Sequence, residues 1–113
     1  LLGELIDLLH ARGTAVVVYH SVVYNEYFWE EHPESRIVDA RGESGRLQVG
    51  TPVLARRPCV CCPNSPTYRA FVEAQLREIC AGYEFEGFYP DNCFWPTVCY
   101  CPSCRAQGSS SSW

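Results

Sequence analysis

The stretch Thr14-Ala15-Val16-Val17-Val18-Tyr19 is apolar almost throughout and rich in β-branched residues. Such an uninterrupted run predicts a strand that is buried on both faces, as in a parallel sheet. A second stretch with strand character, Phe85-Glu86-Gly87-Phe88-Tyr89, follows much later in the chain. The two stretches predict the two strands of a βαβ unit.

The helix that connects these strands is expected to begin at Pro66, with Ser65 as its N-cap. Apolar side chains then recur at helical spacing until Gly82, at Tyr68, Phe71, Val72, Leu76, Ile79 and Cys80. This pattern predicts that Cys80 is a small buried hydrophobic residue. Residues 1–12 predict another helix, which ends at Gly13 and has an apolar stripe of Leu2, Leu5, Ile6, Leu8 and Leu9.

Between the first strand and Ser65 no long periodic pattern survives, although residues 24–31 favour a short helix. Within it, the pair Glu30-Glu31 is expected to form a solvated face. A loop of about 45 residues is far longer than usual in a compact domain and indicates a functional excursion.

The order of helix, strand, long loop, helix and strand indicates an α/β fold. Two strands leave exposed sheet edges, and a (β/α)8 barrel takes about 250 residues, whereas this chain has 113. The simplest interpretation is a fragment of a (β/α)8 TIM barrel over residues 1–105, followed by a flexible tail over 106–113. The sequence contains no Met, so we expect its natural start to lie upstream or to have been removed.

The composition suits a packed globular core, with 47% hydrophobic residues. The net charge is −4, and no basic stripe is present, which argues against a nucleic-acid partner. No apolar run reaches the length of a transmembrane helix, so we expect no membrane partner. The expected location is the cytoplasm, and the oligomeric state is left open.

Cysteine is the most informative residue type. The run Cys99-Tyr100-Cys101-Pro102-Ser103-Cys104 brings three thiols so close together that they can point at one centre. A fourth sulfur, from Cys93, Cys62, Cys61 or Cys59, would complete a tetrahedral structural zinc site. The eight cysteines also leave open a disulfide framework or free thiols.

Two further features suggest a polar site at the ends of the strands. Asp91 follows the second strand, where reactive groups of α/β folds collect, although an Asx turn explains it equally well. After the first strand comes a set of aromatic and polar residues that suits a sugar, or else ordinary loop packing: Tyr19, His20, Tyr24, Asn25 and Trp29.

Several short motifs resemble those of barrel glycoside hydrolases. The chain carries in order His32-Pro33-Glu34, Val38-Asp39, Cys62-Pro63-Asn64-Ser65-Pro66, Tyr68-Arg69 and the cysteine run, as in family 42 β-galactosidases. The segment from Gly87 to Cys101 resembles the hypothetical glycosyl hydrolase family 6 group, whose members are α-L-fucosidase-like.

This resemblance implies a barrel fragment around strands three and four, in which Cys62 joins Cys99, Cys101 and Cys104 around structural zinc. Family 42 has its acid/base glutamate where Asn92 is followed by Cys93 here, so the chain departs from that pattern. The fucosidase-like pattern has an aspartate at the end of strand four, which implies that Asp91 is the nucleophile of a retaining glycosidase. The carbohydrate-binding residues would be Tyr19, His20, Asn25 and Trp95.

The resulting hypothesis is a fragment of a glycoside hydrolase that acts on carbohydrate. A retaining enzyme needs two carboxyl groups roughly 5–5.5 Å apart, and Asp91 supplies one, so we expect the fragment to be inactive alone. The alternative is a small zinc-binding structural or interaction module without catalysis. A secreted disulfide protein is a third possibility.

Overall fold

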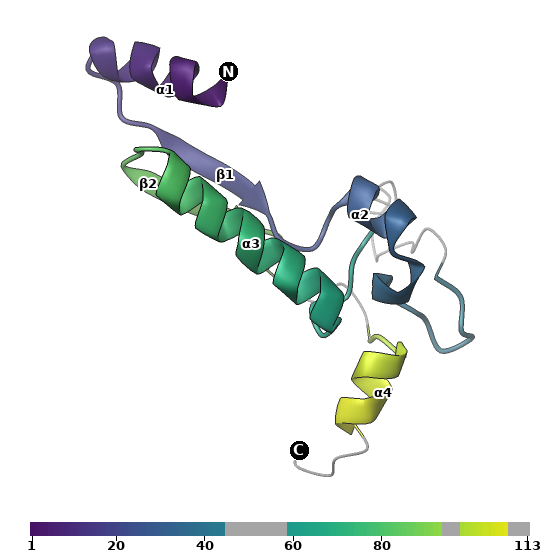
Figure 1. Cartoon of the computed structure of the whole chain (residues 1–113). Coiled ribbons are helices and arrows are strands. Elements are labelled where there is room, and N and C mark those ends of the chain that lie inside the picture. Colours follow the sequence, from purple (N-terminus) through teal and green to yellow (C-terminus); the bar gives the residue numbers. More distant parts are fainter. Residues whose placement is uncertain (45–58, 94–97, 109–113) are drawn as a thin grey trace.

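A computed structural model describes residues 1–44, 59–93 and 98–108 of the chain (Figure 1). The molecule is elongated, with extents of 53 × 33 × 28 Å, and α1 and α4 lie at opposite ends of it. The elements follow in the order α1 (Leu2–Ala11), β1 (Val17–Ser21), α2 (Glu26–Glu31), η1 (Pro33–Ser35), α3 (Pro66–Gly82), β2 (Gly87–Asp91) and α4 (Pro102–Gly108).

The two strands pair in parallel, as the sequence predicts, from Val17 opposite Gly87 to Ser21 opposite Asp91. A side chain at Gly87 would lie only 3.2 Å from that of Val17, so glycine allows the strands to approach. Burial on both faces is wrong, because Val17 is 64% and Tyr19 54% exposed. In the described part of the chain nothing further covers them. The fold is thus a small α/β unit, and its origin as a fragment of a (β/α)8 barrel stays a prediction.

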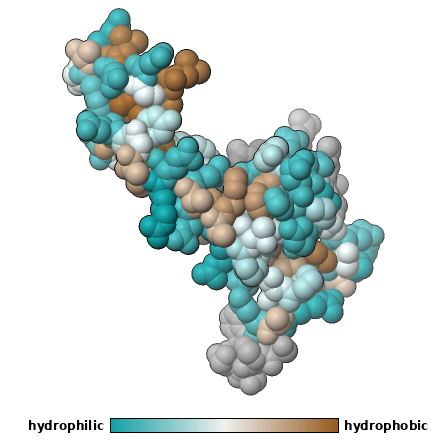
Figure 2. All heavy atoms as spheres, in the orientation of Figure 1, coloured by the Kyte–Doolittle hydropathy of each residue, from teal (hydrophilic) through white to brown (hydrophobic). Residues whose placement is uncertain are grey.

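Helix α1 has its predicted bounds to within a residue, and Gly13 follows it with a positive φ of 74°. Only Ile6 of its apolar stripe is buried. Leu2, Leu5 and Leu8 remain exposed, and apolar residues gather at this end of the molecule (Figure 2). A hydrophobic pattern predicts a face that favours burial, but it does not supply the partner that buries it.

Helix α3 lies alongside the two strands (Figure 1). It begins as predicted, because the Ser65 hydroxyl accepts a hydrogen bond from the Tyr68 amide at 3.4 Å and Pro66 occupies the first turn. Tyr68 is buried, but the predicted burial of Cys80 is wrong, since that residue is exposed. Cys80 lies near the C-terminal end of the helix, on its exposed side.

The excursion after β1 is ordered where the structure describes it. Residues 26–31 form the short helix α2, capped by Asn25, and Glu30 and Glu31 are exposed as expected. Segment 59–62 then lies between two earlier stretches of the excursion, one at Tyr24 and one at Arg36. It makes antiparallel bridges from Val60 to Tyr24 and from Cys61 to Arg36. Residues 45–58 lie outside the described part.

The buried core lies in this excursion rather than under the strands. One cluster, which we call the cysteine core, consists of Val23, Ile37, Val60, Cys62 and Cys101. A second, aromatic cluster consists of Phe28, Cys61 and Tyr68, with Trp29, Phe71 and Val72 packed against it. Except for Cys101, the buried residues of both clusters belong to the segment that joins the strands.

Helix α4 extends through residues 106–108, where the sequence suggested the start of a flexible tail. Residues 109–113 lie outside the described part. Among the described helices, none is both long and apolar enough to cross a membrane.

Candidate metal centre

Three separate segments deliver the cysteines to one point. Backbone hydrogen bonds hold segment 59–62 in place, with Cys61 donating to Val23 at 2.8 Å and Cys62 to Ser35 at 2.7 Å. The segment after β2 is anchored where the Tyr100 amide donates to the Val38 carbonyl at 2.8 Å. Helix α4 then carries Cys104 back to the same centre.

The four sulfur atoms of Cys62, Cys99, Cys101 and Cys104 all lie within 4.8 Å of one another. The Cys62 sulfur lies 3.4 Å from that of Cys104 and 3.7 Å from that of Cys101. A disulfide would require about 2.05 Å, and none of the eight cysteines, all of which lie in the described part of the chain, forms one. Zinc–sulfur bonds of about 2.3 Å in a tetrahedron place the sulfurs roughly 3.8 Å apart. The structure thus brings together four thiols that could hold one metal ion.

N–H groups point at these sulfurs from the surrounding chain. The amide of Val38 donates to Cys99 at 3.5 Å, and the amide of Cys104 donates to Cys101 at 3.5 Å. The side-chain amide of Asn64 donates to Cys104 at 3.4 Å. Donors around ligand atoms orient them and stabilise their negative charge. Each of these N–H donors therefore favours the thiolate form of the sulfur that it contacts.

The thiols also act on one another. A hydrogen bond between the Cys62 and Cys99 side chains raises the pKa of Cys62 and lowers the pKa of Cys99 to about 5. Burial raises the pKa of Cys62 further and that of Cys104 as well. A cation at the centre would supply the positive charge that several close thiolates require.

The other cysteines are placed differently. Cys61 is fully buried, its thiol donates to the Asn25 carbonyl at 3.7 Å, and burial raises its pKa to about 12. Cys59 is also buried, whereas Cys80 and Cys93 are exposed. Of the four candidates for the fourth ligand, the group of described residues that could hold a metal therefore contains Cys62. Cys59, Cys61, Cys80 and Cys93 do not belong to it.

Of the residues predicted to form a sugar site, only some lie together. The hydroxyl of Tyr19, in the middle of β1, donates at 2.8 Å to the carboxylate of Asp91, the last residue of β2. His20 instead contacts Gln75 of α3 through its Nε2 atom at 3.2 Å. Asn25 caps α2, because its side-chain oxygen accepts from the Phe28 amide at 2.9 Å. Trp95 lies outside the described residues.

Sequence reasoning missed two polar residues near these groups. Asn92 is 8% exposed, adopts a φ of 57° and donates to the Ser21 hydroxyl at 3.1 Å. Asn64 is the second, and its side-chain amide donates to the Cys104 sulfur. Its position two residues after Cys62 could have indicated this contact, because a polar residue close to a metal ligand in sequence can reach the same centre.

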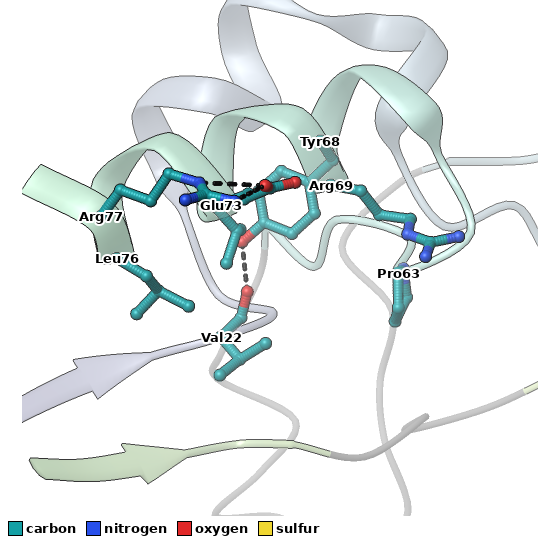
Figure 3. Close-up of a pocket in the computed structure, with 8 residues that line it drawn as sticks. Val22, Pro63, Tyr68, Arg69, Glu73, Leu76 and Arg77 are labelled. Carbon is teal, nitrogen blue, oxygen red and sulfur yellow. Dashed lines mark hydrogen bonds and ion pairs between the residues drawn. The ribbon is translucent and has the colours of Figure 1, made fainter.

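A separate pocket of about 470 Å³ lies between α3 and the chain that follows β1 (Figure 3). The Tyr68 hydroxyl donates to the Val22 carbonyl at its base, and the Glu73–Arg77 ion pair lies on α3. Its described lining residues are Val22, Pro63, Tyr68, Arg69, Val72, Glu73, Leu76 and Arg77. These do not include Tyr19, His20, Asn25 or Asp91, so the predicted sugar-binding residues are not the walls of this pocket.

Comparison with known proteins gives partial matches to a GTPase. The chain is 37% identical over 92 residues to GTPase Der of Prochlorococcus marinus (strain MIT 9313). It is 35% identical over 92 residues to GTPase Der of Synechococcus sp. (strain CC9311), and likewise to that of strain WH7803. Each match covers 76% of this chain, which spans only 18% of the length of each relative.

No family model matches the chain, and no solved structure matches it significantly. Because the curated relatives are named as GTPases, the resemblance to glycoside hydrolases is wrong. The predicted hydrolysis of glycosides, with its fucosidase-like and β-galactosidase-like variants and its carbohydrate substrate, is wrong with it. The cysteine cluster does not depend on that resemblance, since the structure places the four sulfurs together.

Proposed function

We propose that this chain is a structural metal-binding module in which Cys62, Cys99, Cys101 and Cys104 hold one zinc ion. A single observation carries the proposal, namely that these four sulfurs lie within 4.8 Å of one another. Two of them, Cys62 and Cys101, belong to the cysteine core and are at most 1% exposed. The ion would therefore be part of the hydrophobic core of the excursion.

The donor set favours zinc in a closed site. Four thiolates in a tetrahedron suit zinc or iron, and they exclude the hard cations that prefer oxygen ligands. Catalytic zinc sites keep one position open for water, whereas a four-cysteine site fills every position. The role that follows is structural, because the ion would join segment 59–62 to the segment after β2 and to α4.

Metal content tests this proposal directly. Purified protein, dialysed against metal-free buffer, should retain one zinc per chain by elemental analysis. Cys101→Ser should lose it, because an uncharged hydroxyl replaces a buried ligand that is 1% exposed. The matched control is Cys80→Ser, which removes an exposed thiol outside the cluster and should leave the zinc content unchanged.

Two results would contradict the proposal. One is wild-type protein that retains no zinc after exposure to it, and the other is equal zinc loss in both serine variants. Retention of iron instead of zinc, visible as colour, would keep the site but change the ion.

The names of the curated relatives favour a second candidate, participation in a GTP-hydrolysing protein. A P-loop, the usual GTPase phosphate cradle, needs a glycine-rich turn followed by lysine, and this sequence contains no lysine at all. We therefore place the metal module, and not a P-loop nucleotide site, within these 113 residues.

A titration separates the two candidates. Zinc-loaded chain added to a fluorescent N-methylanthraniloyl derivative of GTP should give no saturable change in fluorescence, with or without magnesium. The matching ATP derivative serves as the control for nonspecific binding. Saturable binding of the GTP derivative alone would establish a nucleotide site in this chain and overturn our placement.

A further inference from the structure

The four sulfurs of the candidate centre differ in their access to solvent. Cys62 is 0% and Cys101 1% exposed, whereas Cys99 and Cys104 are partly exposed. Cys99 accepts hydrogen bonds from two backbone amides, those of Val38 and Cys101. For Cys104 the described N–H donor is the side chain of Asn64. A side-chain donor can swing away and a backbone donor cannot, so of the two partly exposed sulfurs Cys104 is the one whose donor can leave.

A second thiol lies beside it. The Cys62 sulfur is 3.4 Å from the Cys104 sulfur and is shielded from solvent. Cys104 sits on the short helix α4, whose residues 105–108 are exposed. Closing 3.4 Å to a bond of about 2.05 Å requires only a small shift of that helix.

We propose that Cys104 is an oxidation site for hydroperoxides and that Cys62 is its resolving thiol. This inference rests on the proposed zinc site and adds a means by which its ion is released. Within the cluster, the Cys104 sulfur is partly exposed and the neighbouring Cys62 sulfur is buried.

The chemistry balances with hydrogen peroxide as the oxidant. The Cys104 thiolate attacks one peroxide oxygen, the O–O bond breaks, and sulfenic acid and hydroxide form. The Cys62 thiolate then attacks the Cys104 sulfur, the S–O bond breaks, a disulfide forms and a second hydroxide leaves. Two electrons pass from the thiolates to the peroxide, and two protons from water or buffer convert the hydroxides to water. With two of its four ligands consumed, zinc is released.

The disulfide would join two of the three segments that zinc joins. Cys62 lies at the end of segment 59–62, and Cys104 lies on α4. Oxidation would therefore exchange one crosslink for another, while a dithiol reductant and added zinc restore the first.

The test uses the zinc-loaded full chain, with its zinc content measured before oxidation. Hydrogen peroxide is added in steps, released zinc is measured with a chromogenic chelator, and the linked peptides are mapped by non-reducing mass spectrometry. We expect one zinc released per disulfide formed, a Cys62–Cys104 linkage, and full recovery with dithiothreitol and zinc. If the loaded sample holds no zinc at the outset, the proposed function fails, independently of this inference.

Two variants test whether the released zinc depends on oxidation of Cys104. Asn64→Leu removes the described side-chain donor to Cys104 and should release zinc several-fold faster at equal peroxide. The doubly substituted Cys80→Ser, Cys93→Ser chain removes exposed thiols outside the cluster and should release zinc at the wild-type rate. A Cys62–Cys99 linkage, or oxidation of Cys80 and Cys93 while zinc stays bound, would overturn the inference. Mapping of the wild-type chain decides the matter even if Asn64→Leu does not fold.

Discussion

Removal of zinc by a strong chelator is expected to unfold the part of the chain that surrounds the cysteine core. Structural zinc sites contribute apparent binding energies of about 10–16 kcal/mol. A whole domain is stable by only about 5–15 kcal/mol. Without the ion, four close thiols would remain, of which Cys62 and Cys101 are buried. The expected result is loss of the packing that Val23, Ile37 and Val60 now provide.

Hydrogen exchange followed by mass spectrometry checks this result locally. The amides of Cys61, Cys62 and Tyr100 donate across segments, so their protection should vanish without zinc and return when it is added back. The control is Cys101→Ser, which should exchange fast in both conditions. Equal protection of these amides in the zinc-loaded and zinc-free chain would show that the ion is not structural.

Replacement of Phe28 by alanine is expected to lower the free energy of unfolding by about 3–5 kcal/mol, the usual cost of truncating a buried phenylalanine. Phe28 is 3% exposed, and its ring centroid lies 5.1 Å from that of Tyr68 and 4.5 Å from that of Phe71. The substitution would leave a cavity between α2 and α3, next to the segment that carries Cys61. Denaturant unfolding at saturating zinc measures the loss.

The neighbouring Tyr27 supplies the matched control. It belongs to the same helix but is 72% exposed, so Tyr27→Ala should change stability by no more than about 0.5 kcal/mol. Similar losses for the two variants would mean that the aromatic cluster does not hold α2 against α3. Zinc content, measured in parallel, separates this loss from loss of the metal.

The ends of the helices and the shared centre of three cysteines could be predicted, because neighbouring residues in the sequence determine them. Ser65 and Pro66 mark the start of α3 through one side-chain acceptor and one fixed backbone angle. Gly13 follows α1 at a positive φ that glycine adopts without strain. The spacing of Cys99, Cys101 and Cys104 likewise predicts a shared centre, since nearby ligands on a short loop can converge.

Features that depend on distant partners could not be predicted in the same way. Cys80 falls at an apolar position of α3, but burial requires a neighbour that the described chain does not place there. The bridges of segment 59–62 to Tyr24 and Arg36 join residues far apart in sequence, and no periodicity encodes them. They decide which cysteine completes the cluster, a choice that the sequence left among four residues.

The mistaken family resemblance has a physical origin as well. The motif Cys62-Pro63-Asn64-Ser65-Pro66 combines a metal-ligand residue type, a donor to a neighbouring sulfur and the start of a helix. Each of these is a general solution to a structural problem, so proteins of unrelated function can share it. Such motifs indicate what a segment does locally, and they carry less information about the reaction of the whole protein.

The placement of Cys62 before α3 and of Cys99 after β2 has a consequence for the denatured chain. An ion held by both closes a ring that contains the whole helix and strand between them. Ring closure lowers the conformational entropy of a chain, and the effect grows only slowly with ring size. If residual zinc stays on both cysteines during unfolding, the ring restricts the conformations of the denatured segment that contains α3 and β2.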